Sequence, residues 1–222
     1  MSFISVFDVI GPNMVGPSSS HTAGACAIAY LAQKMNNGIL KNVTFTLYGS
    51  FAKTYRGHGT DRALLGGIMG FSTDDIRIRD SFSIAGEQGI GFSFVPDETD
   101  TDVHPNTVDI RMENADGRVM TVRGESTGGG KVRIVRINQV QVDFTGEFNA
   151  VIIIQQDKPG VAAHITKCLG DQNVNIAFMR IFRESKGETA YTIVESDGRL
   201  PDDIMPRLMA NPHVHDVMLI QN

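Results

Sequence analysis

Hydroxyl groups and a histidine are concentrated in one short stretch near the start of the chain. The segment "GPSSSHTAGA", residues 16–25, contains five polar residues directly before an apolar run: Ser18, Ser19, Ser20, His21 and Thr22. One serine is enough to cap a helix, because its side-chain oxygen accepts a hydrogen bond from an unpaired backbone N–H. The surplus hydroxyls and the partial positive charge of a helix start suit a carboxylate or a phosphate. Simple capping and anion binding are both open at this point.

A second polar stretch, "YRGHGTDRAL", covers residues 55–64. His58 lies between two glycines, so its backbone can approach a ligand closely. Thr60 is expected to cap the following helix, and Asp61 suits the first turn of that helix. The alternative is a glycine-rich connector with a solvated histidine.

Two further loops combine small polar side chains with turn-forming residues. "HPNT" places His104, Asn106 and Thr107 just before a predicted strand, and "ESTGGG" follows at 125–130. His-Pro-Asn is also ordinary turn chemistry. Four such loops favour a small polar ligand that is held by short side chains and backbone groups. None of them matches a common phosphate-binding or hydrolase motif.

The elements that position these loops form a mixed pattern. A helix is predicted from about residue 19 to 35, a strand over 43–50, two short helices within 51–70, and weaker helices over 73–78 and 81–88. From about residue 90 onward the chain is mostly strands, ending in a pair around the turn at 138–139. Helices followed by strands are typical of an α+β domain.

The end of the chain has a different and more regular order. A buried-type strand at 148–156 precedes a helix at 161–172, two strands at 175–185 and 188–198, a helix near 201–212 and a last strand from 214. This βαββαβ order is the ferredoxin-like arrangement. The sequence therefore predicts two domains, residues 1–146 and 147–222.

Composition excludes several classes of function. The net charge is −5 with no basic run, which argues against nucleic acid as a partner. No apolar stretch approaches the roughly 20 residues of a membrane span, and the N-terminus does not resemble a signal peptide, so we expect no membrane partner. The low cysteine count predicts a protein of the reducing cytoplasm. Cys26 and Cys168 are the only cysteines. They are too few for a disulfide framework or for a self-contained iron–sulfur cluster.

The four loops, in this order, resemble the β chain of the two-subunit, iron–sulfur-dependent bacterial L-serine dehydratases. The strongest motif is "SVFDVIGPNMVGPSSSHTAGA", followed by "GHGTDRA" and "HPNT". In the last loop, Thr127 replaces the aliphatic residue that is usual in the family. The domain also resembles the allosteric substrate-binding domain of phosphoglycerate dehydrogenases, and residues 148–222, with "DKPG" and "NVNIAFMRIFR", resemble an ACT domain.

The resemblance implies conversion of L-serine to pyruvate and ammonia at a [4Fe–4S] cluster whose thiolates belong to an α subunit. The open iron of such a cluster would act as a Lewis acid on the substrate hydroxyl. Ser18, Ser19, Ser20 and Thr22 would hold the substrate carboxylate. The implied proton-handling groups are His21, His58 and His104, and the implied pocket wall is Thr60, Asp61, Asn106 and Thr107. The catalytic base is not identified and could belong to the α subunit.

The ACT resemblance implies a regulatory amino-acid ligand at two loops, with the contributing residues Asp157, Pro159, Gly160, Asn173, Asn175 and Ile176. Alternatively, this domain only pairs two copies of the chain, and a homodimer through the ACT domains is expected. A competing hypothesis for the whole chain is a non-catalytic amino-acid sensor.

Overall fold

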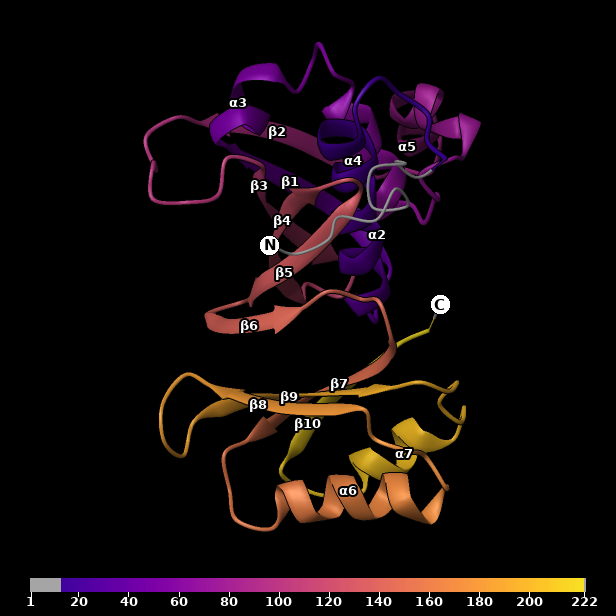
Figure 1. Ribbon diagram of the computed structural model, residues 1–222, viewed down its shortest axis with the longest axis vertical. Coiled ribbons are helices and arrows are strands. Elements are labelled where there is room, and N and C mark those ends of the chain that lie inside the picture. The colour runs from indigo at the N-terminus through magenta and orange to yellow at the C-terminus, as the bar shows by residue number, and fades with distance from the viewer. Residues whose placement is uncertain (1–12, 222) are drawn as a thin grey trace, which may run out of the picture. The chain divides into compact units, whose positions relative to one another are not determined.

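The computed structural model describes residues 13–221, which form two compact units that divide between Asn138 and Gln139 (Figure 1). This division falls at the two-residue turn between strands β5 and β6, where Asn138 has a positive φ of 52°. The domain boundary at residue 146 stays a prediction. No helix of the described residues is long and apolar enough to cross a membrane.

The first unit is a mixed α+β structure, as expected. Its elements are η1 (Ser19–Ala23), α2 (Gly24–Met35), β1 (Leu40–Tyr48), α3 (Gly49–Thr54), α4 (Thr60–Ile68), η2 (Ile76–Asp80), α5 (Ser81–Glu87), β2 (Gly91–Asp97), β3 (Thr107–Asn114), β4 (Val119–Gly128) and β5 (Lys131–Ile137). The strand order of the sheet is β2-β1-β3-β4-β5-β6, with β6 (Val140–Phe144) beyond the turn. β1 pairs with β2 in parallel and with β3 antiparallel.

Close packing of helix α2 fixes the core of this unit. Alternate residues of β1, such as Phe45, are fully buried, as the period of two in a strand requires. α2 lies so close to β4 that a Cβ at Gly124 would stand 3.1 Å from the Cγ1 of Ile28. A Cβ at Gly67 of α4 would stand 2.9 Å from the Cβ of Ala29. Glycine therefore sets the distance from α2 to both of its neighbours.

The second unit has the predicted βαββαβ order (Figure 1). After β6, its elements are β7 (Asn149–Gln156), α6 (Val161–Asp171), β8 (Phe178–Arg183), β9 (Thr189–Ser196), α7 (Ile204–Met209) and β10 (Val214–Ile220). The strand order β10-β7-β9-β8 is antiparallel throughout. Ile153 and Val194 of the sheet, Ile165 of α6 and Leu208 of α7 belong to one buried apolar cluster.

Three local expectations need correction. The predicted helix of residues 19–35 begins as a π-helical turn before it becomes α-helical at Gly24. The first strand begins at Leu40 rather than at 43, and Gly49 and Ser50 belong to helix α3 rather than to the strand. The weaker helix predicted at 73–78 is a 3₁₀ helix at 76–80. In each case backbone pairing or loop geometry overrides the apolar periodicity.

Gly24→Ala tests the packing of α2 against β4. A Cβ at this helical position would lie 2.7 Å from the Cβ of Ser126, which is fully buried. We expect the substitution to destabilise the chain by about 1–3 kcal/mol, the usual cost of overpacking.

The matched control is Gly86→Ala in α5, where a Cβ has open space, and it should be neutral or stabilising by about 0.5–1 kcal/mol. Urea midpoints of the two variants provide the comparison, and Ser126→Gly in the Gly24→Ala background should recover stability. Equal midpoints for Gly24→Ala and Gly86→Ala would contradict the packing argument.

Candidate active site

The hydroxyl-rich segment begins the helix as expected, with one serine as its cap. Ser18 has extended backbone angles, and its Oγ accepts a hydrogen bond from the backbone N–H of His21 at 3.1 Å. The backbone N–H of Gly24 donates to the carbonyl of Ser19, five residues earlier, which makes the first turn wider than an α-helical turn. Ser19 and Ser20 remain half-exposed within this turn.

The wide turn directs His21 into a small polar cluster. Its Nε2 lies 2.8 Å from the Oγ of Ser50, and its Nδ1 lies 3.4 Å from the Oγ of Ser18. The ring meets the ring of His58 edge-on, with centroids 4.9 Å apart, and also packs against Phe51. Burial, and secondarily the charge of His58, lower the pKa of His21 below its usual 6.5. His21 is therefore neutral at pH 7 and able to accept a proton.

His58 is attached to the same cluster through its backbone. The hydroxyl of Thr22 donates to the carbonyl of His58 at 3.0 Å, which joins the first polar stretch to the second. Thr60 does not cap α4, because Gly59 occupies that position with a left-handed φ of 67°. Thr60 is instead fully buried, and its Oγ1, like the Nδ1 of His58, has no hydrogen-bond partner among the described residues.

Asp61 lies in the first turn of α4, as expected. Burial raises the pKa of this carboxyl, while a hydrogen bond from the backbone N–H of Arg62 to its Oδ1 at 2.8 Å acts in the opposite direction.

The "HPNT" loop reaches the cluster through the carbonyl of Pro105. This carbonyl accepts a hydrogen bond from the backbone N–H of Ser50 at 2.7 Å, directly beside the serine hydroxyl that contacts His21. The close approach requires glycine at position 49, where φ is 52° and a Cβ would lie 2.7 Å from the Pro105 oxygen. The third polar stretch is thus attached to the start of α3.

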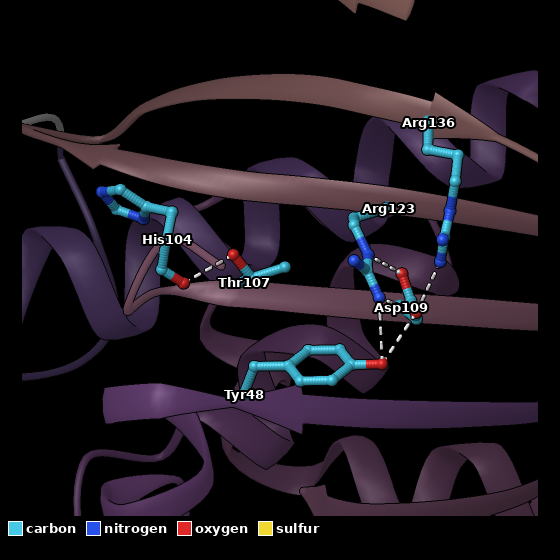
Figure 2. A network of polar contacts seen from close by, with 6 residues as sticks. All are labelled: Tyr48, His104, Thr107, Asp109, Arg123 and Arg136. Carbon is cyan, nitrogen blue, oxygen red and sulfur yellow. Dashed lines mark hydrogen bonds and ion pairs between the residues drawn. The ribbon is translucent and has the colours of Figure 1, made fainter. Parts of the chain in front are cut away.

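Within this loop the polar groups mainly hold one another. The Nδ1 of His104 accepts from the backbone N–H of Asn106 at 3.2 Å, and the hydroxyl of Thr107 donates to the His104 carbonyl at 2.6 Å (Figure 2). The amide nitrogen of Asn106 donates to the carbonyl of Ser126, from the fourth loop, at 3.4 Å. The Oδ1 of Asn106 and the Oγ of Ser126 are buried without a partner among the described residues.

The structure therefore brings His21, His58, Ser18 and Thr22 together, and joins the "HPNT" loop to them through the backbone. The ring of His104 is held by its own loop rather than by the His21–His58 pair. Sequence reasoning missed Ser50 and did not single out Ser126. A serine directly after a glycine at the end of a predicted strand was the available signal for Ser50.

An ion-pair network supports the strands behind these loops (Figure 2). The carboxylate of Asp109 on β3 accepts from the guanidinium of Arg123 on β4 at 2.6 and 2.7 Å, and from Arg136 on β5 at 2.8 Å. The hydroxyl of Tyr48 on β1 donates to the same carboxylate at 2.9 Å. One aspartate thus joins four strands, two residues along β3 from Thr107.

The described residues do not provide a ligand set for an iron–sulfur cluster. The thiol of Cys26 is buried, donates to the carbonyl of Phe71 and has a pKa raised to about 12 by burial. Cys168 is a free thiol in the second unit. No group of three or more histidine, cysteine, aspartate or glutamate side chains suited to a metal ion occurs in the described part of the chain.

In the second unit, the loop after β7 is anchored at its first residue. The carboxylate of Asp157 accepts from the backbone N–H of Gly187 at 3.1 Å and from Arg183 at 2.9 Å, and these two bonds lower its pKa. Gly160 and Asn173 both have positive φ, 91° and 56°, so both predicted ligand loops turn sharply.

Comparison with known proteins agrees with this architecture: a small mixed α+β unit with a polar loop cluster, followed by a ferredoxin-like unit. Residues 5–90 match the family model for the serine dehydratase beta chain, and residues 150–213 match the ACT domain. The chain is 38% identical to the L-serine dehydratase beta chain of Peptoniphilus asaccharolyticus over 94% of both chains. It is 37% identical to the probable L-serine dehydratase beta chain of Bacillus subtilis over 99% of both.

The chain therefore belongs to the L-serine dehydratase beta-chain family. It is also similar to the D-3-phosphoglycerate dehydrogenase of Bacillus subtilis, with 29% identity over 82% of this chain and 34% of that enzyme. This likeness agrees with the expected relation of the first unit to a domain of those dehydrogenases.

The lowered pKa of His21 is directly measurable. NMR titration of the imidazole should give a midpoint below 6.5, and His58→Gln should raise that midpoint because it removes the second cause of the shift. The pKa of His21 is lower in the folded chain than in the unfolded chain, so the unfolded chain binds the proton more tightly. The contribution of neutral His21 to the free energy of unfolding is therefore present above pH 6.5 and is lost as the pH falls through the folded-state pKa.

Asn106→Ala, which leaves the contacts of His21 in place, serves as the control and should not move the midpoint. A midpoint for His21 at or above 6.5 would contradict the burial that the structure assigns to this ring.

Proposed function

We propose that this chain is the β subunit of an L-serine ammonia-lyase, which converts L-serine to pyruvate and ammonia together with an α subunit. The observation that carries the proposal is the cluster of His21, Ser18, Ser50 and His58, built by loops that are far apart in the sequence. The family names supply the reaction class, and the beta-chain name implies an α partner. The alternative, a sensor without turnover, has no comparable support.

The hydroxyl-rich turn is the proposed site of the substrate carboxylate. Ser19 and Ser20 are half-exposed, and their hydroxyls, with backbone N–H groups of the wide turn, can donate to a carboxylate. Ser18 is used for capping, and Thr22 is used for holding His58 in place. The four hydroxyls thus divide into two binding groups and two positioning groups.

His21 is the proposed proton acceptor of this subunit. Its pKa is lowered, so the imidazole is neutral near pH 7. Both ring nitrogens lie next to serine hydroxyls, each of which can donate or accept, so the ring keeps its orientation in either protonation state. Loss of the α-proton and of the hydroxyl from L-serine gives aminoacrylate and water, and hydrolysis of the derived imine gives pyruvate and ammonia.

A [4Fe–4S] cluster does not fit the residues of this chain, since Cys26 is buried with a raised pKa and Cys168 lies in the other unit. We propose that its ligands belong to the α subunit. The free state of both cysteines supports the cytoplasm as the location of the protein.

The test of this function is an assay of the chain co-expressed with its α subunit and purified without oxygen. The pair should form pyruvate from L-serine, and His21→Ala should lower kcat by about 100-fold or more, the usual contribution of a general base or acid. Ser50→Ala should lower kcat less and shift the acidic limb of the pH profile, because Ser50 positions His21.

The matched control is Ser83→Ala on α5, whose hydroxyl contacts only the exposed Glu87 among the described residues, and it should retain wild-type rates. Wild-type kcat in His21→Ala would remove the histidine from the reaction. A pair that binds L-serine and releases no pyruvate would favour the sensor.

For the second unit we propose pairing of two copies through β8. This strand lies at the edge of its sheet, and Phe178 and Ile181 on it are 49% and 47% exposed. An exposed edge strand with apolar residues is a natural surface for pairing with a second strand. Asp157, in the proposed regulatory loop, is held by Arg183 at the end of the same strand. A ligand bound at Asp157–Gly160 and Asn173–Ile176 would therefore lie next to the paired edges.

Ile181→Lys tests this pairing. We expect the wild-type chain to sediment as a dimer and the variant to shift towards the monomer, because a charge on an edge strand opposes pairing. Met209→Lys on α7, 43% exposed, introduces the same charge away from β8 and should remain dimeric. An unchanged dimer in Ile181→Lys would exclude β8 as the interface.

A further inference from the structure

Three arginines of the first unit differ from the other arginines in their surroundings. Most arginines of the described chain stand within ion-pair distance of a carboxylate, as Arg77 does with Asp75 at 2.5 Å and Arg118 with Asp116 at 2.7 Å. For Arg56, Arg62 and Arg79, no carboxylate of the described residues lies within that distance. Unpaired guanidinium groups are available to bind an anion.

These three arginines line one cavity. It has a volume of about 330 Å³ and also includes Gly16, Thr22 and His58 in its wall. Arg56 comes from the loop between α3 and α4, Arg62 from α4, and Arg79 from η2. Three separate segments therefore contribute a positive charge to the same hollow, and no acidic side chain belongs to its lining.

The guanidinium of Arg62 is fixed within this wall. It donates to the backbone carbonyl of Arg79 and stacks over the ring of Phe82, with 4.8 Å from the guanidinium carbon to the ring centroid. The hydrogen bond joins α4 to η2, and so sets the spacing of two of the three arginines. Arg56 and Arg79 are exposed and form no ion pair with a carboxylate of the described residues, so their donors are available for a ligand.

The carboxylate of Asp61 does not line this cavity. The charges of Arg62 and Arg56 act to lower the pKa of Asp61, but Asp61 lines a neighbouring cavity, to which Arg56 also contributes. The Oδ1 of Asp61 accepts a hydrogen bond from the backbone N–H of Arg62. The positive charge of the arginine-lined cavity therefore lacks a counterion from the described side chains.

We propose that this cavity is a binding site for a small oxyanion, a phosphate or carboxylate group carried by a metabolite, with Arg56, Arg62 and Arg79 as its ligands. Guanidinium groups bind such oxyanions through paired N–H donors. The cavity adjoins the hydroxyl-rich turn proposed for the substrate through Thr22, and His58 is also in its wall, so an anion bound here would contact the loop that carries His58. A cavity of about 330 Å³ is at the lower end of the range for small-molecule sites, which favours a small ligand.

The experiment measures binding of inorganic phosphate to the full-length chain by calorimetry, in chloride buffer of constant ionic strength, with acetate as a second probe. Saturable binding of phosphate, of acetate or of both is expected, and the preferred probe identifies the ligand group. Arg79→Gln and Arg56→Gln should each raise the dissociation constant of the bound probe about tenfold or more, because a charge-assisted hydrogen-bond pair is lost.

Arg118→Gln makes the same change of net charge in the turn between β3 and β4, and should alter binding by less than about twofold, since salt screens a distant charge. A second readout is the thermal shift that saturating phosphate produces, which should persist in Arg118→Gln and disappear in Arg79→Gln. In the wild-type chain, the NMR chemical shifts of the His58 imidazole should change when the ligand binds, because His58 is in the wall of the cavity.

Three results would overturn the proposal. The first is absence of saturable binding of either probe. The second is equal weakening in Arg118→Gln and Arg79→Gln, which would indicate a general charge effect. The third is unchanged phosphate binding in both Arg56→Gln and Arg79→Gln. The wild-type chain could also fail to bind phosphate while Arg56→Gln and Arg79→Gln no longer associate with the α subunit. That result would indicate that the arginines bind an acidic segment of the partner instead.

Discussion

The arrangement of the polar loops depends on two places where the backbone passes too close to a neighbour for any side chain. At Gly24 the neighbour is Ser126, and at Gly49 it is the backbone of Pro105. The first contact holds the hydroxyl-rich turn against β4, and the second holds the start of α3 against the "HPNT" loop. Ser50 follows Gly49 directly, so the second contact also determines where the hydroxyl beside His21 lies. Without these approaches the four loops would remain separate turns.

The His21 cluster contains no carboxylate or guanidinium among the contacts of His21 that the structure describes, whereas charged groups gather elsewhere in the first unit. On the sheet, behind the loops, Asp109 forms ion pairs with Arg123 and Arg136. Arg56, Arg62 and Arg79 gather in the cavity beside His58. His21 itself contacts serine hydroxyls and the rings of Phe51 and His58, and burial lowers its pKa. Neutral imidazole next to hydroxyl groups is the state in which a proton can be accepted at pH 7.

Much of the fold could be predicted because the relevant signals are local. The βαββαβ order follows from alternating and helical periodicities, and Ser18 is a cap of the expected type. Ser50 could not be predicted in the same way, since its role depends on a contact with a residue 29 positions away in the chain. The capping role expected of Thr60 was wrong for a local reason: Gly59 takes the cap position in the left-handed conformation, and Thr60 is buried instead.

The wide turn of Ser19–Ala23 makes the length of this segment as important as its composition. A π-helical turn contains one more residue than the α-helical turn it replaces, so deletion of one residue would leave a continuous helix behind. That helix would still begin at a serine and still pack on β4, but the residues before Gly24 would be rotated around its axis. His21 would then face away from Ser50. An insertion or deletion in this segment would therefore break the contact between His21 and Ser50 even if every side chain were kept, unlike in the surface loops where length normally varies.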